Sequence, residues 1–114
     1  MLRWSAEETN RTVDLRGIVD PSVDPGMPGG RQLVALARSA AQQVPDPSLA
    51  EALARELGPG AAVDAAAVAS AFELYNRVVD ATGLPIGRAY RRQMADVIDL
   101  LGLEMMPHAV TGRE

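Results

Sequence analysis

The 114-residue chain contains no cysteine, and its single histidine, His108, lies near its end. Without cysteine there can be no disulfide, no thiolate nucleophile and no cysteine-ligated metal. A metal site needs several ligands, and no second histidine can join His108. We therefore expect no metal and no other cofactor, and we interpret His108 as part of a C-terminal tail rather than as a general base.

Lysine is also absent, so all 11 basic residues are arginine, and 15 acidic residues bring the net charge to −4. Nonspecific nucleic-acid binding depends on clustered positive charge, which makes this class of partner unlikely to fit an acidic chain. The first eight residues lack the apolar region of a secretory signal. No run approaches the roughly 18 apolar residues of a membrane span. We expect a cytoplasmic protein that does not bind membranes.

Aromatic residues are scarce, at 4%, although hydrophobic residues make up 47% of the chain. Alanine, leucine and valine supply most of that fraction. Alanine and leucine favour helices, whereas aromatic and β-branched side chains favour strands. The length suits one domain. The composition therefore predicts a small all-α domain.

Residues 1–30 are predicted to form an N-terminal arm. Ser5 and Glu8 have the spacing of a capping box, so one short helix could run from there to about Leu15. Three prolines and three glycines between Asp20 and Gly30 argue against regular structure in that stretch. The sequence leaves open whether the arm lies along its own body or packs on a partner.

Two helices are predicted next, over residues 31–43 and 47–57. Apolar residues recur at helical spacing in each. Asp46 has the side chain of an N-cap, and Pro47 suits the first helical position because its missing N–H needs no partner there. Glu51 and Arg55 form an i,i+4 pair. Gly58-Pro59-Gly60 is expected to end the second helix.

A third helix is predicted from an N-cap at Asp64 to the residue before Gly83, which suits a C-terminal cap. A helix that is apolar over most of its circumference belongs at the centre of a bundle. We therefore expect this helix to be buried nearly all the way around, with only a narrow polar strip. Its two apolar rows are Val68, Phe72, Tyr75 and Val79, and Ala67, Ala71, Leu74 and Val78; the strip is Ser70, Glu73, Asn76, Arg77 and Asp80.

A fourth helix is predicted to follow Pro85 and to end at about Leu101, before Gly102. Tyr90 lies in its apolar stripe, so Tyr90 and Tyr75 are both expected in the core. Short links between helices favour antiparallel neighbours. The prediction is a bundle of about four main helices over residues 31–102, followed by a C-terminal tail over 103–114.

The stretch 61–72, which contains Val-Asp-Ala-Ala-Ala-Val, and the stretch 76–85, Asn-Arg-Val-Val-Asp-Ala-Thr-Gly-Leu-Pro, resemble a known family. They are similar to the C-terminal region of carboxymuconolactone decarboxylase-like proteins, the alkylhydroperoxidase D-like superfamily. The resemblance covers about residues 48–103. It implies an all-helical and usually oligomeric fold. Peroxidase-type members use a Cys-x-x-Cys pair with a Glu and a His, which this chain lacks, so no catalytic residue carries over.

Three groups of residues are candidates for contacts with a ligand or partner. Glu73, Asn76 and Arg77 could line a pocket, although the same spacing suits a solvated strip with a Glu73–Arg77 pair, which we favour. An arginine cluster at the start of the fourth helix could hold an anion or partner, because cations there oppose the helix macrodipole. Exposed Trp and Met often anchor interfaces, but they could equally cover the chain's own core. The cluster is Arg88, Arg91 and Arg92; the apolar candidates are Trp4, Met105 and Met106.

Three functions follow from these observations. We favour a non-catalytic helical interaction or self-association module, with a homo-oligomer or another protein as partner. One alternative is a cysteine-independent decarboxylase-like or peroxidase-like enzyme, which would need Glu73, Arg77 and Arg92 to converge on one pocket. The other is a binder of small anions or nucleic acid that uses the Arg88–Arg92 cluster.

Overall fold

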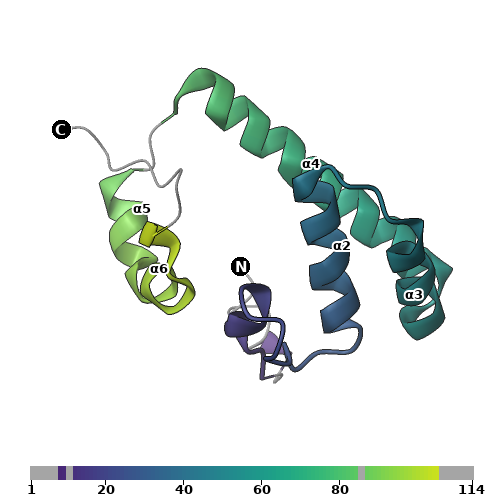
Figure 1. Ribbon diagram of the computed structural model, residues 1–114. Coiled ribbons are helices and arrows are strands. Elements are labelled where there is room, and N and C mark those ends of the chain that lie inside the picture. The colour runs from purple at the N-terminus through teal and green to yellow at the C-terminus, as the bar shows by residue number, and fades with distance from the viewer. Residues whose placement is uncertain (1–7, 10–11, 85–86, 106–114) are drawn as a thin grey trace.

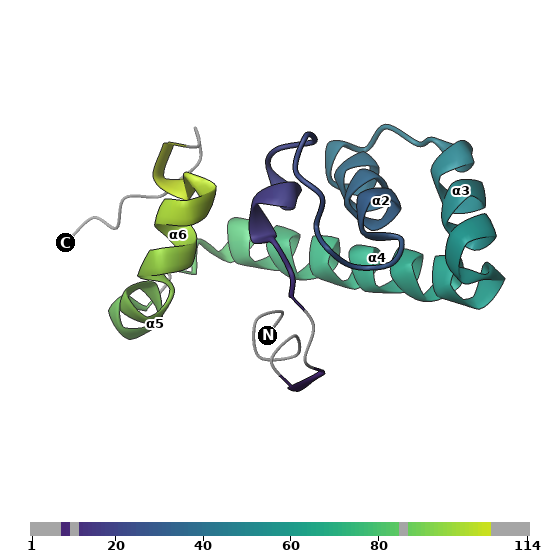
Figure 2. The same ribbon diagram turned by 90° about the horizontal axis from the view of Figure 1, so that it is seen from below.

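The computed structural model describes residues 8, 9, 12–84 and 87–105. These residues form helices and turns without a strand, which confirms the all-α prediction. Helices α2 and α3 pack against each other and against α4, and α5 and α6 lie beyond its C-terminal end (Figures 1 and 2). The elements in chain order are η1 (Leu15–Ile18), α2 (Gly30–Gln42), α3 (Pro47–Leu57), α4 (Pro59–Thr82), α5 (Arg88–Gln93), α6 (Ala95–Leu101) and η2 (Leu103–Met105).

Helix α3 has the boundaries that its sequence predicts. The Asp46 carboxylate accepts hydrogen bonds from the Ser48 amide at 3.0 Å and from the Ser48 hydroxyl at 2.6 Å, and Pro47 occupies the first turn. Glu51 and Arg55 form the expected pair, with 3.9 Å between Oε2 and Nη1. The start of this helix is therefore set by local hydrogen bonding within four residues.

The prediction that the third helix begins at Asp64 is wrong. Helix α4 begins at Pro59, and Gly58 with φ 95° both ends α3 and caps α4. Proline is favoured at a first helical position because its fixed φ suits the helix and no amide is left without a partner. Gly58 thus makes a sharp corner between two helices, and Pro59 starts the next helix rather than ending the last. The predicted end is confirmed, since Gly83 has φ 63°.

The predicted fourth helix is divided into two. Met94, at φ −101° and ψ 8°, separates α5 from α6. Residues Val97 and Leu100 of α6 share a hollow with residues 12–15, and α6 packs against η1. The break therefore turns the apolar side of α6 toward the N-terminal segment. The predicted end before Gly102 is confirmed, with φ 61° at this glycine.

Residues 12–30 of the predicted arm fold back on themselves and pack on α2. The Asp14 amide donates to the Pro25 carbonyl at 3.0 Å, and Arg38 Nη2 donates to the Ile18 carbonyl at 3.0 Å. Residues 12–14 are not helical, and the short 3-10 helix η1 starts only at Leu15, so the expected helix does not reach Leu15 in the described residues. The Ser5 capping box lies outside the described residues.

Three carboxylates of this loop have a lowered pKa, and they predict a response to acid. The Arg16 guanidinium lowers the pKa of Asp14, the Ser22 hydroxyl that of Asp20, and the Gly26 amide that of Asp24. A carboxylate with a depressed folded pKa stabilises the fold above its unfolded value, 3.8, and this contribution is lost as pH falls through the lower folded value. We expect residues 12–30 to lose amide protection below about pH 4.

Hydrogen exchange of residues 12–30 between pH 5 and pH 2, corrected for intrinsic exchange, measures this effect. Asp14→Asn should reduce the acid sensitivity, because the amide cannot be protonated in that range. Protection that stays constant down to pH 2 would contradict the proposed role of these carboxylates.

Gly29 makes a close approach that a side chain would obstruct. It has φ 65°, and a Cβ there would lie 2.7 Å from Leu57 Cδ1 and 3.3 Å from Leu53 Cδ1. We expect Gly29→Ala to lower the free energy of unfolding by about 1–3 kcal/mol, from left-handed strain and overpacking. Urea unfolding measures it. Gly60→Ala is the matched control, since nothing lies within 4 Å of its Cβ position; equal losses in both variants would refute the packing argument.

Candidate functional site

The buried side of α4 is lined by alanines. Leu53 at 0% exposure and Ala62 at 9% are the buried hydrophobic residues of the described chain, and they mark a small core among α2, α3 and the first half of α4. Ala65 and Ala69, three and seven residues after Ala62, are also partly covered. Residues at this spacing share one side of a helix. Helix α4 therefore presents small side chains to its neighbours.

The opposite side of α4 is apolar and exposed. The prediction that this helix is shielded nearly all the way around is wrong for the single chain. We call this side the outward face. Its large side chains and their exposed fractions are Val63 68%, Val68 57%, Phe72 60%, Leu74 61%, Tyr75 65%, Val78 52% and Val79 40%, and the exposed Ala67 and Ala71 lie among them.

The polarity of α4 is thus reversed relative to an ordinary surface helix. Glu73, Asn76 and Asp80 continue the line of Ala62, Ala65 and Ala69 at spacings of three and four residues, so this polar strip lies on the same side as α2 and α3. A surface helix normally turns its apolar stripe inward and its charges to water. In α4 the broad apolar side is turned away from the chain's own core.

The surface of the whole chain is larger than that of a compact monomer. The chain exposes 9029 Å², whereas a compact protein of 12.1 kDa exposes about 6000 Å². Its radius of gyration is 15.4 Å, against about 13 Å for a compact domain of this length. Figure 2 shows the reason in the described part, because the C-terminal half of α4 extends past α2 and α3 without packing on α5 or α6.

The predicted candidates on α4 lie at the border of the outward face or behind it. Glu73 is half-buried, and Asn76 and Arg77 are exposed. The expected Glu73–Arg77 ion pair does not form between these two described residues. Sequence reasoning missed Val63 and Asp64 as members of the outward side, because it placed the start of the helix at Asp64. Their helical spacing from Ala67 and Ala71 was the signal that could have identified them.

The arginine candidates lie on α5, apart from those of α4. Arg91 Nη1 is 3.9 Å from Glu104 Oε1, and Arg92 Nε donates to the Arg88 carbonyl at 3.4 Å. Helix α4 does not pack against α5 in the described residues. The structure therefore does not bring Glu73 and Arg77 together with Arg92, as the enzyme hypothesis requires.

The apolar candidates are only partly described. Met105 is 89% exposed at the end of η2, while Trp4, Met106 and His108 lie outside the described residues. Tyr75 and Tyr90, expected in the core, are 65% and 58% exposed, so that expectation is wrong. Both tyrosines lie on helix faces that no other described element covers.

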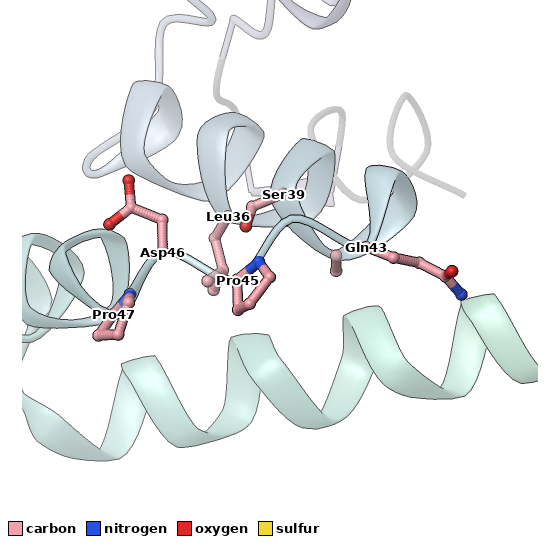
Figure 3. A pocket seen from close by; sticks show the side chains of 7 residues that line it. Leu36, Ser39, Gln43, Pro45, Asp46 and Pro47 are labelled. Atoms are coloured by element: carbon pink, nitrogen blue, oxygen red, sulfur yellow. The ribbon is translucent and has the colours of Figure 1, made fainter.

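The largest described hollow, about 500 Å³, lies between the end of α2, the start of α3 and α4. Figure 3 shows the rings of Pro45 and Pro47 directed toward α4 and the Asp46 carboxylate directed away from it. The polar groups here have local structural roles: Asp46 caps α3, and the Ser39 hydroxyl donates to the Val44 carbonyl. The hollow lacks a nucleophile, a base or a cation aimed into it. The lining residues are Leu36, Ser39, Ala40, Gln43, Pro45, Asp46 and Pro47.

The described ranges contain no group of three His, Asp or Glu side chains placed to hold a metal ion. Within the same ranges no helix, α4 included, combines the length and the apolarity needed to cross a bilayer. Comparisons of the chain with known proteins find no matching family model, no curated relative and no similar solved structure. The outward face of α4 is therefore the surface feature from which a function must be argued.

Proposed function

We propose that this chain is a non-catalytic helical interaction or self-association module, related to the C-terminal part of alkylhydroperoxidase D-like proteins. The observation that carries the proposal is the outward face of α4. Monomeric proteins seldom expose contiguous apolar patches beyond a few hundred Å², and larger ones mark interaction sites. The seven large side chains of this face lie on one helix at 40–68% exposure.

The energetics favour association through this face. Covering the exposed part of each large side chain contributes about 1 kcal/mol, which amounts to roughly 15 kcal/mol for the faces of two copies. Association costs an estimated 4–15 kcal/mol in lost translational and rotational freedom. Burial of this face is therefore large enough to support a specific complex at ordinary protein concentrations.

The mass of the purified protein tests the proposal. We expect sedimentation equilibrium at micromolar concentration to give a multiple of 12.1 kDa, or a stable complex with a second, identified protein. Dilution should lower the average mass of a homo-oligomer, since a burial-driven interface obeys mass action. A strict monomer of 12.1 kDa up to the highest attainable concentration, with no copurifying protein, would overturn the proposal.

A further inference from the structure

We propose that the outward face of α4 pairs with the same face of a second copy of this chain, in antiparallel orientation, with the two-fold axis near residues 70 and 71. This inference rests on the proposed function and specifies its partner and geometry. Two-fold dimers are the commonest closed assemblies, and their interface uses one surface patch twice. A single long apolar helix face meets that requirement without any second patch on the chain.

The size of the exposed surface fits a second copy. Obligate dimers bury about 2000–5000 Å² in total, or roughly half of that on each chain. The chain exposes 9029 Å², about 3000 Å² more than a compact protein of its mass. Helix α4 has 24 residues and is about 36 Å long, so complete overlap of two copies would cover the whole outward face.

The side chains along the middle of the face permit close helix pairing. Ala67 and Ala71 lie at its centre, with Leu74 and Val78 on one side and Tyr75 on the other. Small residues let two helix axes approach, and the larger flanking side chains then pack around them. The midpoint of α4, residues 59–82, falls between Ser70 and Ala71, which places these alanines near the proposed axis.

Charge decides the orientation. Asp64 is five residues from the first residue of α4, and Arg77 is five residues from the last. Complete antiparallel overlap sets each Asp64 at the level of Arg77 of the partner subunit and opposes the two helix dipoles favourably. A parallel pair would instead bring the two Asp64 carboxylates together beside apolar side chains, where like charges destabilise the contact.

Cysteine cross-linking tests this geometry, because the chain has no cysteine of its own. Ala71→Cys should form a disulfide-linked dimer under mild oxidation, since the two Cys positions lie beside the axis. Val63→Cys alone should not, because its two copies would be about 22 Å apart along the helices, too far for a disulfide. A mixture of Val63→Cys and Val78→Cys should cross-link, since these positions lie opposite each other. All three positions are exposed in the single chain.

Glu56→Cys, at an exposed position of α3, is the matched control and should stay uncross-linked. Circular dichroism checks that each variant retains its helices. Val63→Cys that cross-links with itself as fast as Ala71→Cys would show a parallel pair and overturn the inference. An oligomeric mass without cross-linking at Ala71→Cys would overturn this geometry and leave the proposed function standing, whereas a strict monomer would overturn both.

Discussion

Replacing Leu74 by glutamate is expected to dissociate the native assembly into single chains of 12.1 kDa without loss of helix. Leu74 is 61% exposed in the single chain, so a charged side chain there meets water and costs little. In a covered interface the same carboxylate would lose its hydration without a partner, at several kcal/mol for each copy. We expect the dissociation constant to rise at least about a hundredfold, as 1.4 kcal/mol corresponds to a factor of ten.

Sedimentation equilibrium and circular dichroism together measure this effect. Val44→Glu is the matched control, because Val44 is also 61% exposed but lies beyond the end of α2, away from α4's outward face. That variant should retain the wild-type mass. Wild-type association in Leu74→Glu, or equal dissociation in Val44→Glu, would show that the outward face of α4 is not the interface.

Replacing Leu53 by alanine is expected to give the largest loss of stability of any single leucine truncation in the described chain. Leu53 is fully buried at 0% exposure, and its Cδ1 lies beside Gly29 in the small core. Removing a buried leucine leaves a cavity and costs about 2–5 kcal/mol. Small domains have only about 5–15 kcal/mol in total, so this loss would leave a substantial fraction of the chain unfolded.

Urea unfolding followed by circular dichroism checks the prediction for Leu53. Leu84→Ala serves as its control, since Leu84 is 65% exposed at the end of α4 and its truncation should change the free energy of unfolding by about 0.5 kcal/mol or less. If the two variants unfold at the same urea concentration, the core does not lie where the structure places it.

The local parts of the fold could be predicted from the sequence because their causes are local. Asp46 caps α3 with groups two residues away, and Gly83 and Gly102 end their helices because a left-handed residue suits glycine. Gly58-Pro59-Gly60 was misread because the same three residues can end one helix or begin another. The break at Met94 depends on packing of α6 against η1, which the spacing of apolar residues does not encode.

The candidate site shows the same limit at the level of packing. The two apolar rows of α4 were evident from their spacing, but spacing fixes only which side chains share a face. It does not say whether that face meets the chain's own helices or those of another molecule. Here Ala62, Ala65 and Ala69 meet α2 and α3, and the rows that contain Leu74 and Tyr75 face outward.

The most direct measurement of the central claim is the reactivity of Tyr75 relative to Tyr90 in the native protein. The two rings are 65% and 58% exposed in the single chain, so hydroxyl radicals should modify them at similar rates there. If the outward face of α4 is covered, Tyr75 will be protected at high protein concentration, while Tyr90 stays reactive, and dilution or Leu74→Glu will restore Tyr75. Similar modification rates for Tyr75 and Tyr90 at every concentration would contradict the account.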